Sequence, residues 1–158
     1  MTPRIVTSTE KKLIGHHLQM CLSDNKTAQL WGEFGPRIKE IQNKVSDAKI
    51  SLQIYPHLYH QNFNPNNTFE KWAAVEVDSL ESIPNGLDSL LLESGTYAVF
   101  NYKGPSADPA IFQYIYSEWL PNSNYVIESR PHFEVLGLHY SKTDINSEEE
   151  IWIPIRNK

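Results

Sequence analysis

One carboxylate interrupts an apolar stretch near the end of the chain. In the segment RPHFEVLGLHY, residues 130–140, Glu134 directly follows Phe133 and is succeeded by further apolar residues. Side chains alternate across a β-strand, so Phe133 and Glu134 should point to opposite faces. The side chains expected on the face of Glu134 are His132, Leu136 and Leu138. A carboxylate in this place attracts a cation when it is charged, and burial that raises its pKa makes it a general acid or base.

The histidines and the cysteine form no recognisable metal or nucleophile motif. His16 and His17 are adjacent, so in a strand they point to opposite faces, and His57 and His60 lie in a predicted loop. Cys21 is the only cysteine, which excludes an intramolecular disulfide and a multi-cysteine zinc site. Neither a glycine-rich phosphate loop nor a Ser/His/Asp signature is present. We therefore predict no metal and no cofactor.

The composition is typical of a soluble globular chain of one domain. The chain has 158 residues, of which 40% are apolar and 21% charged, and we expect a single domain over residues 1–158. The net charge of −5 argues against nucleic acid as a direct partner and is compatible with a cationic ligand. No run approaches the roughly 20 apolar residues of a membrane helix, and no signal peptide is recognisable. We expect a cytoplasmic protein without a membrane partner.

The first half of the chain predicts a strand, a helix and two further strands. The predicted segments are a strand over residues 11–20, a helix over 23–45 and strands over 49–55 and 69–77. The apolar positions at helical spacing are Leu30, Phe34, Ile38 and Ile41. Pro36 and two glycines interrupt this pattern, which predicts a kink or two short helices.

The second half predicts the same order. The predicted segments are a strand over residues 96–104, a helix over 107–120, one strand or two over 124–138 and a last strand over 149–155. Asp108 is a plausible helix N-cap, Pro131 should break the third segment, and Pro154 suggests an edge strand or a bulge. We infer an α+β fold: a duplicated β-α-β-β module, with pseudo-repeats over about residues 5–80 and 95–156. It should have an antiparallel sheet, two helices and a central cleft.

Three motifs of the second half resemble those of one known family. WLPNSNY, RPHFEVL and EIWIPI, at residues 119–125, 130–136 and 150–155, are similar in type and spacing to the GyrI-like small-molecule-binding family. This is the effector-binding domain of bacterial multidrug-responsive transcription activators, and it also occurs as free-standing proteins. The resemblance covers about residues 90–156, whereas residues 1–80 match in element order. Because the predicted first strand leaves no room for a helix-turn-helix before it, we expect a free-standing domain that does not bind nucleic acid directly.

The resemblance implies where a ligand would bind. In such domains the central cleft takes hydrophobic, often cationic, aromatic compounds, and a buried glutamate faces the ligand. Glu134 matches that glutamate, Trp119 matches the tryptophan of the first motif, and Tyr116 lies one turn earlier on the predicted helix. Tyr97 and Trp152 are further candidates, either for the wall of the cleft or for the core.

Two other functions stay open at this point. Some free-standing members of the GyrI-like family hydrolyse reactive, cyclopropane-bearing xenobiotics, and in such an enzyme Glu134 would be the catalytic acid or base. The gyrase-inhibitory protein that names the family acts on a protein partner instead, through an exposed surface. The leading prediction is a domain that binds hydrophobic, aromatic or cationic drug-like molecules. A xenobiotic hydrolase and a protein–protein regulator are the alternatives.

Overall fold

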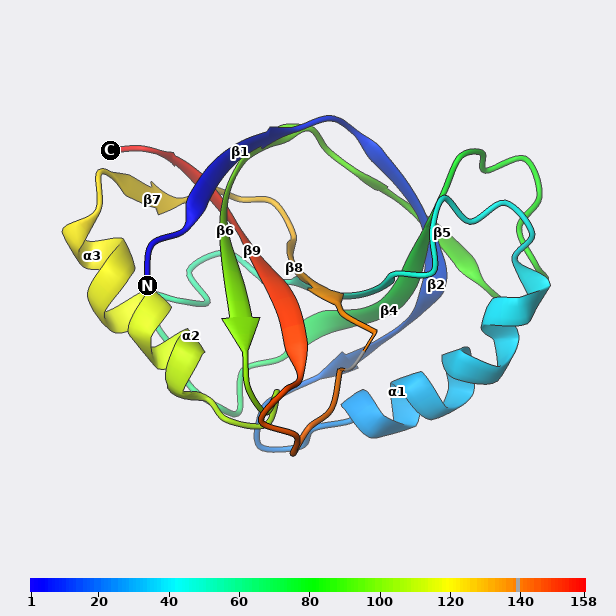
Figure 1. Cartoon of the computed structure of the whole chain (residues 1–158), viewed down its shortest axis with the longest axis horizontal. Coiled ribbons are helices and arrows are strands. Elements are labelled where there is room, and N and C mark those ends of the chain that lie inside the picture. Colours follow the sequence, from blue (N-terminus) through cyan, green and yellow to red (C-terminus); the bar gives the residue numbers. More distant parts are fainter. Residues whose placement is uncertain (139) are drawn as a thin grey trace.

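Residues 1–138 and 140–158 are described by a computed structural model, in which one nine-stranded antiparallel sheet carries two helical regions (Figure 1). The sheet has the order β1-β6-β9-β8-β3-β4-β2-β5, and β7 pairs with β9 beside this row. The strands are β1 (Arg4–Ser8), β2 (Lys11–Met20), β3 (Lys49–Ile54), β4 (Phe69–Val77), β5 (Asp88–Leu92), β6 (Gly95–Lys103), β7 (Tyr125–Ile127), β8 (His132–Leu136) and β9 (Glu148–Asn157). In the described residues no helix combines the length and the apolar character that a membrane crossing requires.

Each helical region changes its helix type along its length. The first is α1 (Thr27–Phe34), followed by the 3₁₀ helix η1 (Gly35–Glu40); the second is α2 (Ala110–Tyr114), the π-helical segment η2 (Ile115–Trp119) and α3 (Leu120–Asn122). The change after α1 falls at Pro36, which lacks an N–H donor, so the interruption predicted from the sequence is confirmed. Before α2, Oδ1 of Asp108 accepts a hydrogen bond from the Ala110 N–H at 2.9 Å.

The two halves of the chain meet in the middle of the sheet. β2, α1, β3 and β4 follow one another in the first half, as β6, α2, β8 and β9 do in the second, and β3 pairs with β8 at the junction. In that pairing Ser51 lies opposite Glu134, and Gln53 lies opposite His132. β1, from the first half of the chain, pairs with β6 of the second half at one edge of the sheet. β5, from the second half, pairs with β2 of the first half at the other edge. The predicted α+β class with an antiparallel sheet and two helical regions is confirmed.

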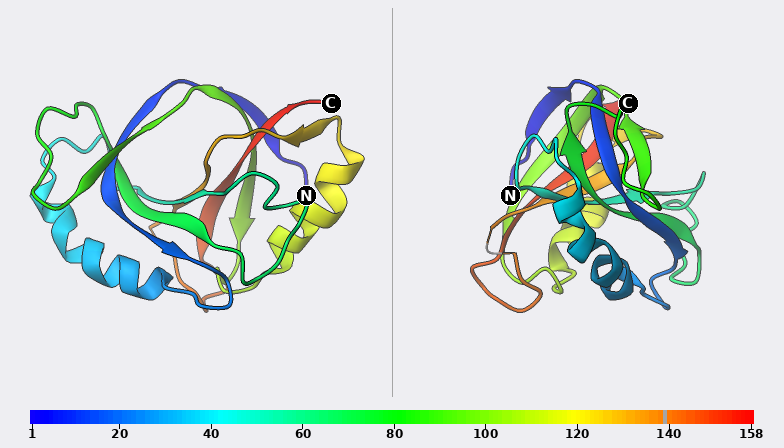
Figure 2. Two further views of the ribbon diagram at one scale, coloured as in Figure 1. Left: turned by 180° about the vertical axis from the view of Figure 1, so that it is seen from behind. Right: turned by 90° about the vertical axis from the view of Figure 1, so that its right-hand side faces the viewer.

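The two faces of the sheet are covered in different ways. The sheet is strongly curled (Figure 2), so one face packs against itself around Leu13, Leu52, Trp72, Val99 and Phe133. The opposite face packs against the helices at its two ends. Under α1 the buried contacts include Ile14, Leu30, Phe34, Ala73 and Val75, and under α2 they include Ala98, Phe100, Ile115, Ile151 and Ile153. The centre of this second face lies between the two helical regions.

Two details of the last strands differ from the sequence prediction. β8 ends at Leu136, and Leu138 lies beyond the strand with 93% of its surface exposed, so Leu138 does not share the face of Glu134. Pro154 lies in an interior strand, opposite Tyr97 of β6, rather than at a sheet edge. On its other side β9 changes its neighbour at this point. It pairs with β8 as far as Trp152, and with β7 from Ile155 onward. The missing N–H of Pro154 therefore falls at the gap between two partners.

Candidate functional site

Four central strands carry the polar side chains that lie between the helices. β8 contributes Glu134, β3 contributes Gln53, β4 contributes Lys71, and β9 contributes Glu149. Their positions alternate with those of the apolar core residues, so they share the face on which the helices pack. Glu134 is half-buried, whereas Gln53, Lys71 and Glu149 are all less than a tenth exposed. We call these four residues the Glu134 cluster.

Gln53 connects the acid to the lysine. With its amide oriented to satisfy both neighbours, the nitrogen donates to Oε2 of Glu134 at 3.0 Å and the oxygen accepts a hydrogen bond from Nζ of Lys71. In the described part of the chain no lysine, arginine or histidine nitrogen lies within 4.0 Å of the Glu134 carboxylate. The carboxylate therefore has a cation nearby, bridged by an amide, but no direct ion pair.

Burial governs the protonation of the cluster. It raises the pKa of Glu134, against the opposing effects of the Lys71 charge and the Gln53 hydrogen bond. It raises the pKa of Glu149 to about 7, helped by the negative charge of Glu134 and opposed by Lys71. For Lys71 burial lowers the pKa, while Glu134 and Glu149 act in the opposite direction. The cluster thus holds two acids and one base whose protonation states depend on one another.

Aromatic side chains stand next to the cluster on the side of α2. The hydroxyl of Tyr116 lies 3.1 Å from Nδ1 of His132, and the Tyr116 ring stacks on His60 with centroids 4.9 Å apart. Tyr55 meets His132 edge-on at 4.9 Å. Burial raises the pKa values of Tyr55 and Tyr116, and the charge of Glu134 adds to both effects.

The two histidines of this aromatic group are uncharged at neutral pH. Burial lowers the pKa of His60 to about 4 and lowers that of His132 well below its usual value. Nε2 of His60 is buried and has no hydrogen-bond partner among the described residues. The aromatic group therefore supplies ring faces and neutral polar atoms, and no positive charge that would compete for Glu134.

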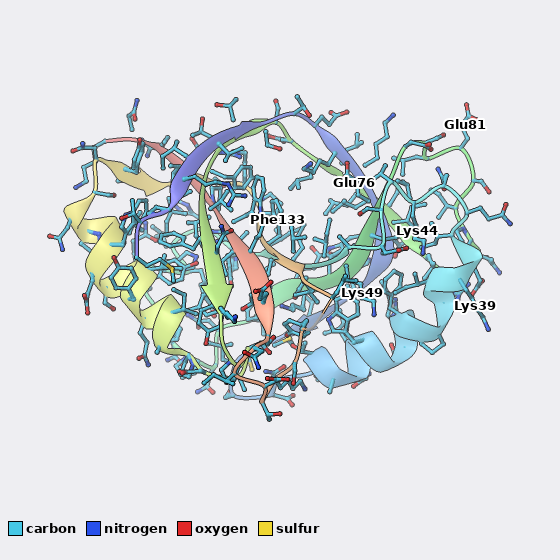
Figure 3. The ribbon with its side chains drawn as sticks, in the orientation of Figure 1. Lys39, Lys44, Lys49, Glu76, Glu81 and Phe133 are labelled. Atoms are coloured by element: carbon cyan, nitrogen blue, oxygen red, sulfur yellow. The ribbon has the colours of Figure 1, made fainter. Side chains whose placement is uncertain are left out.

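The structure brings only one of the predicted aromatic residues to Glu134. Tyr116 lies in the π-helical segment, a helix irregularity that is frequent at functional sites, and its hydroxyl reaches His132, which shares a sheet face with Glu134. Trp119 instead packs in the core under α2, edge-on to Phe100 at 5.1 Å. Tyr97 and Trp152 lie on the opposite face of the sheet, around Phe133. Figure 3 shows Phe133 in the middle of the molecule.

The alternation of side chains along the strands explains why Trp152 does not lie beside Glu134. Trp152 lies directly opposite Phe133 in the pairing of β8 with β9, so it must point away from the face of Glu134. The residues of the site that the sequence did not single out are Gln53, Tyr55, His60, Lys71 and Glu149. Gln53 and Lys71 are polar residues within predicted strands, and a buried polar residue in a strand is the signal that would have drawn attention to them.

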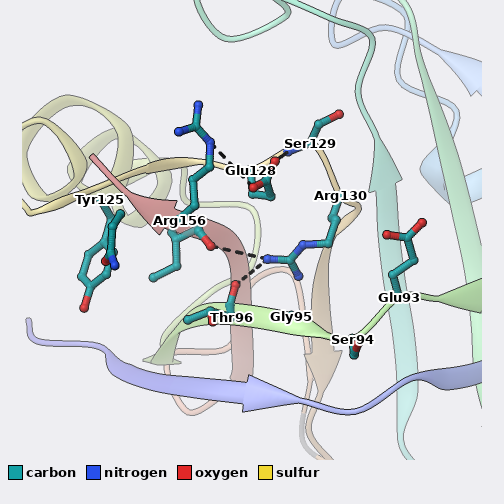
Figure 4. A pocket seen from close by; sticks show the side chains of 11 residues that line it. Glu93, Ser94, Gly95, Thr96, Tyr125, Glu128, Ser129, Arg130 and Arg156 are labelled. Carbon is teal, nitrogen blue, oxygen red and sulfur yellow. Dashed lines mark hydrogen bonds and ion pairs between the residues drawn. The ribbon is translucent and has the colours of Figure 1, made fainter.

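Two open hollows lie in the surface, and the second reaches the Glu134 cluster at Glu149. The first, of about 550 Å³, is lined by Glu93–Thr96, Tyr125, Glu128–Arg130 and Ile155–Asn157 (Figure 4). There Arg130 donates to the carbonyl oxygen of Thr96 at 2.7 Å and covers the Tyr97 ring at 4.6 Å. The second hollow, of about 740 Å³, includes Leu136 and Glu149 in its lining. Within the described residues Glu134 lines neither of these two hollows.

The curled antiparallel sheet with its two helical regions is the fold of GyrI-like effector-binding domains, and the match of an effector-binding family model to the chain confirms the resemblance seen in the sequence. It belongs to the Cass2 family of integron-associated effector binding proteins, whose family model matches residues 4–155. Among curated proteins none matches the chain in sequence.

Solved structures share this fold over nearly the whole chain. One is a putative bacterial transcription regulation protein from Staphylococcus aureus MU50, at 18% identity and a TM-score of 0.68, with 99% of both chains covered. SAV2435, solved bound to tetraphenylphosphonium, has 20% identity and a TM-score of 0.66, with 99% of this chain and 94% of that chain covered. The integron cassette protein VCH_CASS2 of Vibrio cholerae has 14% identity and a TM-score of 0.67, with 98% and 96% covered.

Proposed function

We propose that this protein binds hydrophobic aromatic small molecules, cationic ones included, on the sheet face between its two helical regions, with Glu134 as the polar anchor. Membership in an effector-binding family supports small-molecule binding. The structural neighbour SAV2435 was solved with tetraphenylphosphonium, an aromatic cation, and this supports the chemical class of the ligand.

The observation that carries the proposal is the setting of the Glu134 carboxylate. It is half-buried, it lacks a direct ion pair among the described residues, and it shares a sheet face with His132, whose ring meets Tyr55 edge-on and whose Nδ1 lies 3.1 Å from the Tyr116 hydroxyl. A ligand cation placed there gains Coulomb attraction in a partly dry environment. An aromatic ring face adds roughly 0.5–2 kcal/mol of cation–π attraction when a cation lies over it.

Calorimetric titration with tetraphenylphosphonium tests the proposal. The wild-type protein should bind this cation, and Glu134→Gln, which removes the charge and keeps the shape, should weaken binding by about tenfold or more. Glu118→Gln is the matched control, because Glu118 is an exposed acid of the helical region that carries Tyr116, and its loss changes the net charge equally. Equal affinities of all three proteins, or no binding by the wild type, would contradict the proposal.

A hydrolase on the same scaffold is the second candidate, favoured by the raised pKa values of Glu134 and Glu149. A carboxylic acid with a raised pKa can donate a proton to a leaving group and then act as a base toward water. Turnover of a cyclopropane-bearing electrophile that is lost in Glu134→Gln, while the variant still binds the compound, would favour the enzyme. Binding without turnover by the wild-type protein would favour the first candidate.

A further inference from the structure

Lys71 is an unusual neighbour for the anchor of a cation site. It lies on β4, only 8% of its surface is exposed, and its ammonium group donates to the amide of Gln53, which in turn donates to Glu134. A buried lysine is rare unless it is paired. The charges that oppose the effect of burial on the pKa of Lys71 come from two other strands, Glu134 on β8 and Glu149 on β9.

The position of Lys71 follows from strand pairing. Lys71 is directly opposite Gln53 in the pairing of β4 with β3, and Ser51 of β3 is directly opposite Glu134 in the pairing with β8. Residues two apart in a strand share a face, so Gln53 stands on the face of Glu134, beside it and next to Lys71. The ammonium group is therefore held close to the anchor by the fold, not by a flexible surface side chain.

We infer that Lys71 is a built-in counter-cation of Glu134, which a cationic ligand must outcompete, so that Lys71 sets the preference of the site between cationic and neutral aromatic ligands. This inference rests on the proposed function. A ligand cation that reaches Glu134 meets the repulsion of the Lys71 ammonium in a region where charges are poorly screened. A neutral aromatic ligand meets no such repulsion.

The count of charges supports the same conclusion. With all groups ionised, Glu134 and Glu149 carry two negative charges and Lys71 carries one positive charge, so one negative charge is left over. Protonation of Glu149, whose pKa is raised to about 7, would bring the cluster to neutrality. Removal of the Lys71 charge leaves the acids without their resident cation, and a ligand cation becomes the available partner.

The test compares two ligands on lysine variants. Tetraphenylphosphonium is a permanent cation, and triphenylphosphine oxide is a neutral molecule with similar aromatic rings. Lys71→Met should bind tetraphenylphosphonium about tenfold more tightly than the wild type and bind the neutral oxide within about twofold of it. Lys71→Gln, which keeps a hydrogen-bond donor and loses the charge, should do the same. Lys39→Met, an exposed lysine on η1, controls for the change in net charge.

A double-mutant cycle with Glu134→Gln completes the test, because it isolates the coupling between the two residues. Glu134→Gln should abolish the gain that Lys71→Met produces. If Lys71→Met and Lys71→Gln, both shown to be folded by denaturation curves, leave tetraphenylphosphonium affinity unchanged while Glu134→Gln weakens it, the inference is overturned and the proposed function stands. If Glu134→Gln has no effect either, or the wild type does not bind, the proposed function fails and the inference fails with it.

Discussion

Two neighbouring residues of β8, Phe133 and Glu134, lie on opposite faces of the sheet and have different surroundings. Phe133 is 1% exposed, stacks on Trp152 and meets Tyr97 edge-on. Glu134, one residue later, is half-buried and hydrogen-bonds to Gln53. The first face is a continuous apolar core, whereas the second face gathers the charged residues of the centre of the sheet.

The difference comes from how each face is covered. The curl of the sheet closes one face on itself, so polar groups there would lose their water without gaining partners. The helices cover only the two ends of the other face, and its centre carries the Glu134 cluster, in which hydrogen bonds join Lys71, Gln53 and Glu134. The same strand can therefore stabilise the fold with one set of side chains and contribute a candidate binding site with the alternate set.

The largest effect should come from truncation on the apolar face. Phe133→Ala removes a fully buried ring that contacts two others, and should destabilise the protein by about 3–5 kcal/mol. Phe63→Ala, which truncates a phenylalanine that is 55% exposed, is the matched control and should cost far less. Urea denaturation monitored by circular dichroism measures both. A similar loss in the two variants would mean that the curled face is not the principal core.

A smaller effect should appear on the polar face as a dependence on pH. Glu149 has a folded-state pKa of about 7, above its ordinary value of 4.5, so the folded protein holds this proton more tightly than the unfolded chain does. The resulting stabilisation is complete below about pH 4.5 and is lost as the pH rises through about 7.

Glu149→Gln should therefore remove part of this loss. Between pH 5 and pH 8 the wild type should lose on the order of 1–3 kcal/mol more stability than the variant. Denaturation curves at the two pH values measure the difference. Glu148→Gln, at the exposed neighbouring position, should behave like the wild type. Parallel pH profiles for wild type and Glu149→Gln would show that burial does not raise the pKa of Glu149.

The smallest expected effect concerns the aromatic group beside the cluster. Tyr116→Phe removes the hydroxyl that lies 3.1 Å from Nδ1 of His132, and should cost about 0.5–1.5 kcal/mol of stability. Tyr125→Phe is a suitable control, since its hydroxyl has no hydrogen bond among the described residues. A chemical denaturation experiment at pH 7 is sufficient. An unchanged midpoint in Tyr116→Phe would indicate that water replaces this hydrogen bond at no cost.

Much of the architecture was predictable from local patterns. Alternation along β8 placed Glu134 with His132 and opposite Phe133, and apolar spacing with Pro36 predicted the broken first helical region. The motifs of the second half indicated the family. These features are local, because a period of two or of 3.6 residues already states which side chains share a face. By contrast, β1 and β5 were not predicted, since each is a short strand that pairs with the other half of the chain.

The sequence by itself determined which residues of each strand share a face of the sheet. It also indicated one acid in a strand, Glu134, as the candidate anchor. Only the tertiary structure decided which side chains surround that acid. Gln53 and Lys71 reach Glu134 through the register of β3 with β4 and β8, and the curl of the sheet assigned Tyr97 and Trp152 to the core. Register and curl depend on packing between residues far apart in the chain, and a local period carries no information about them.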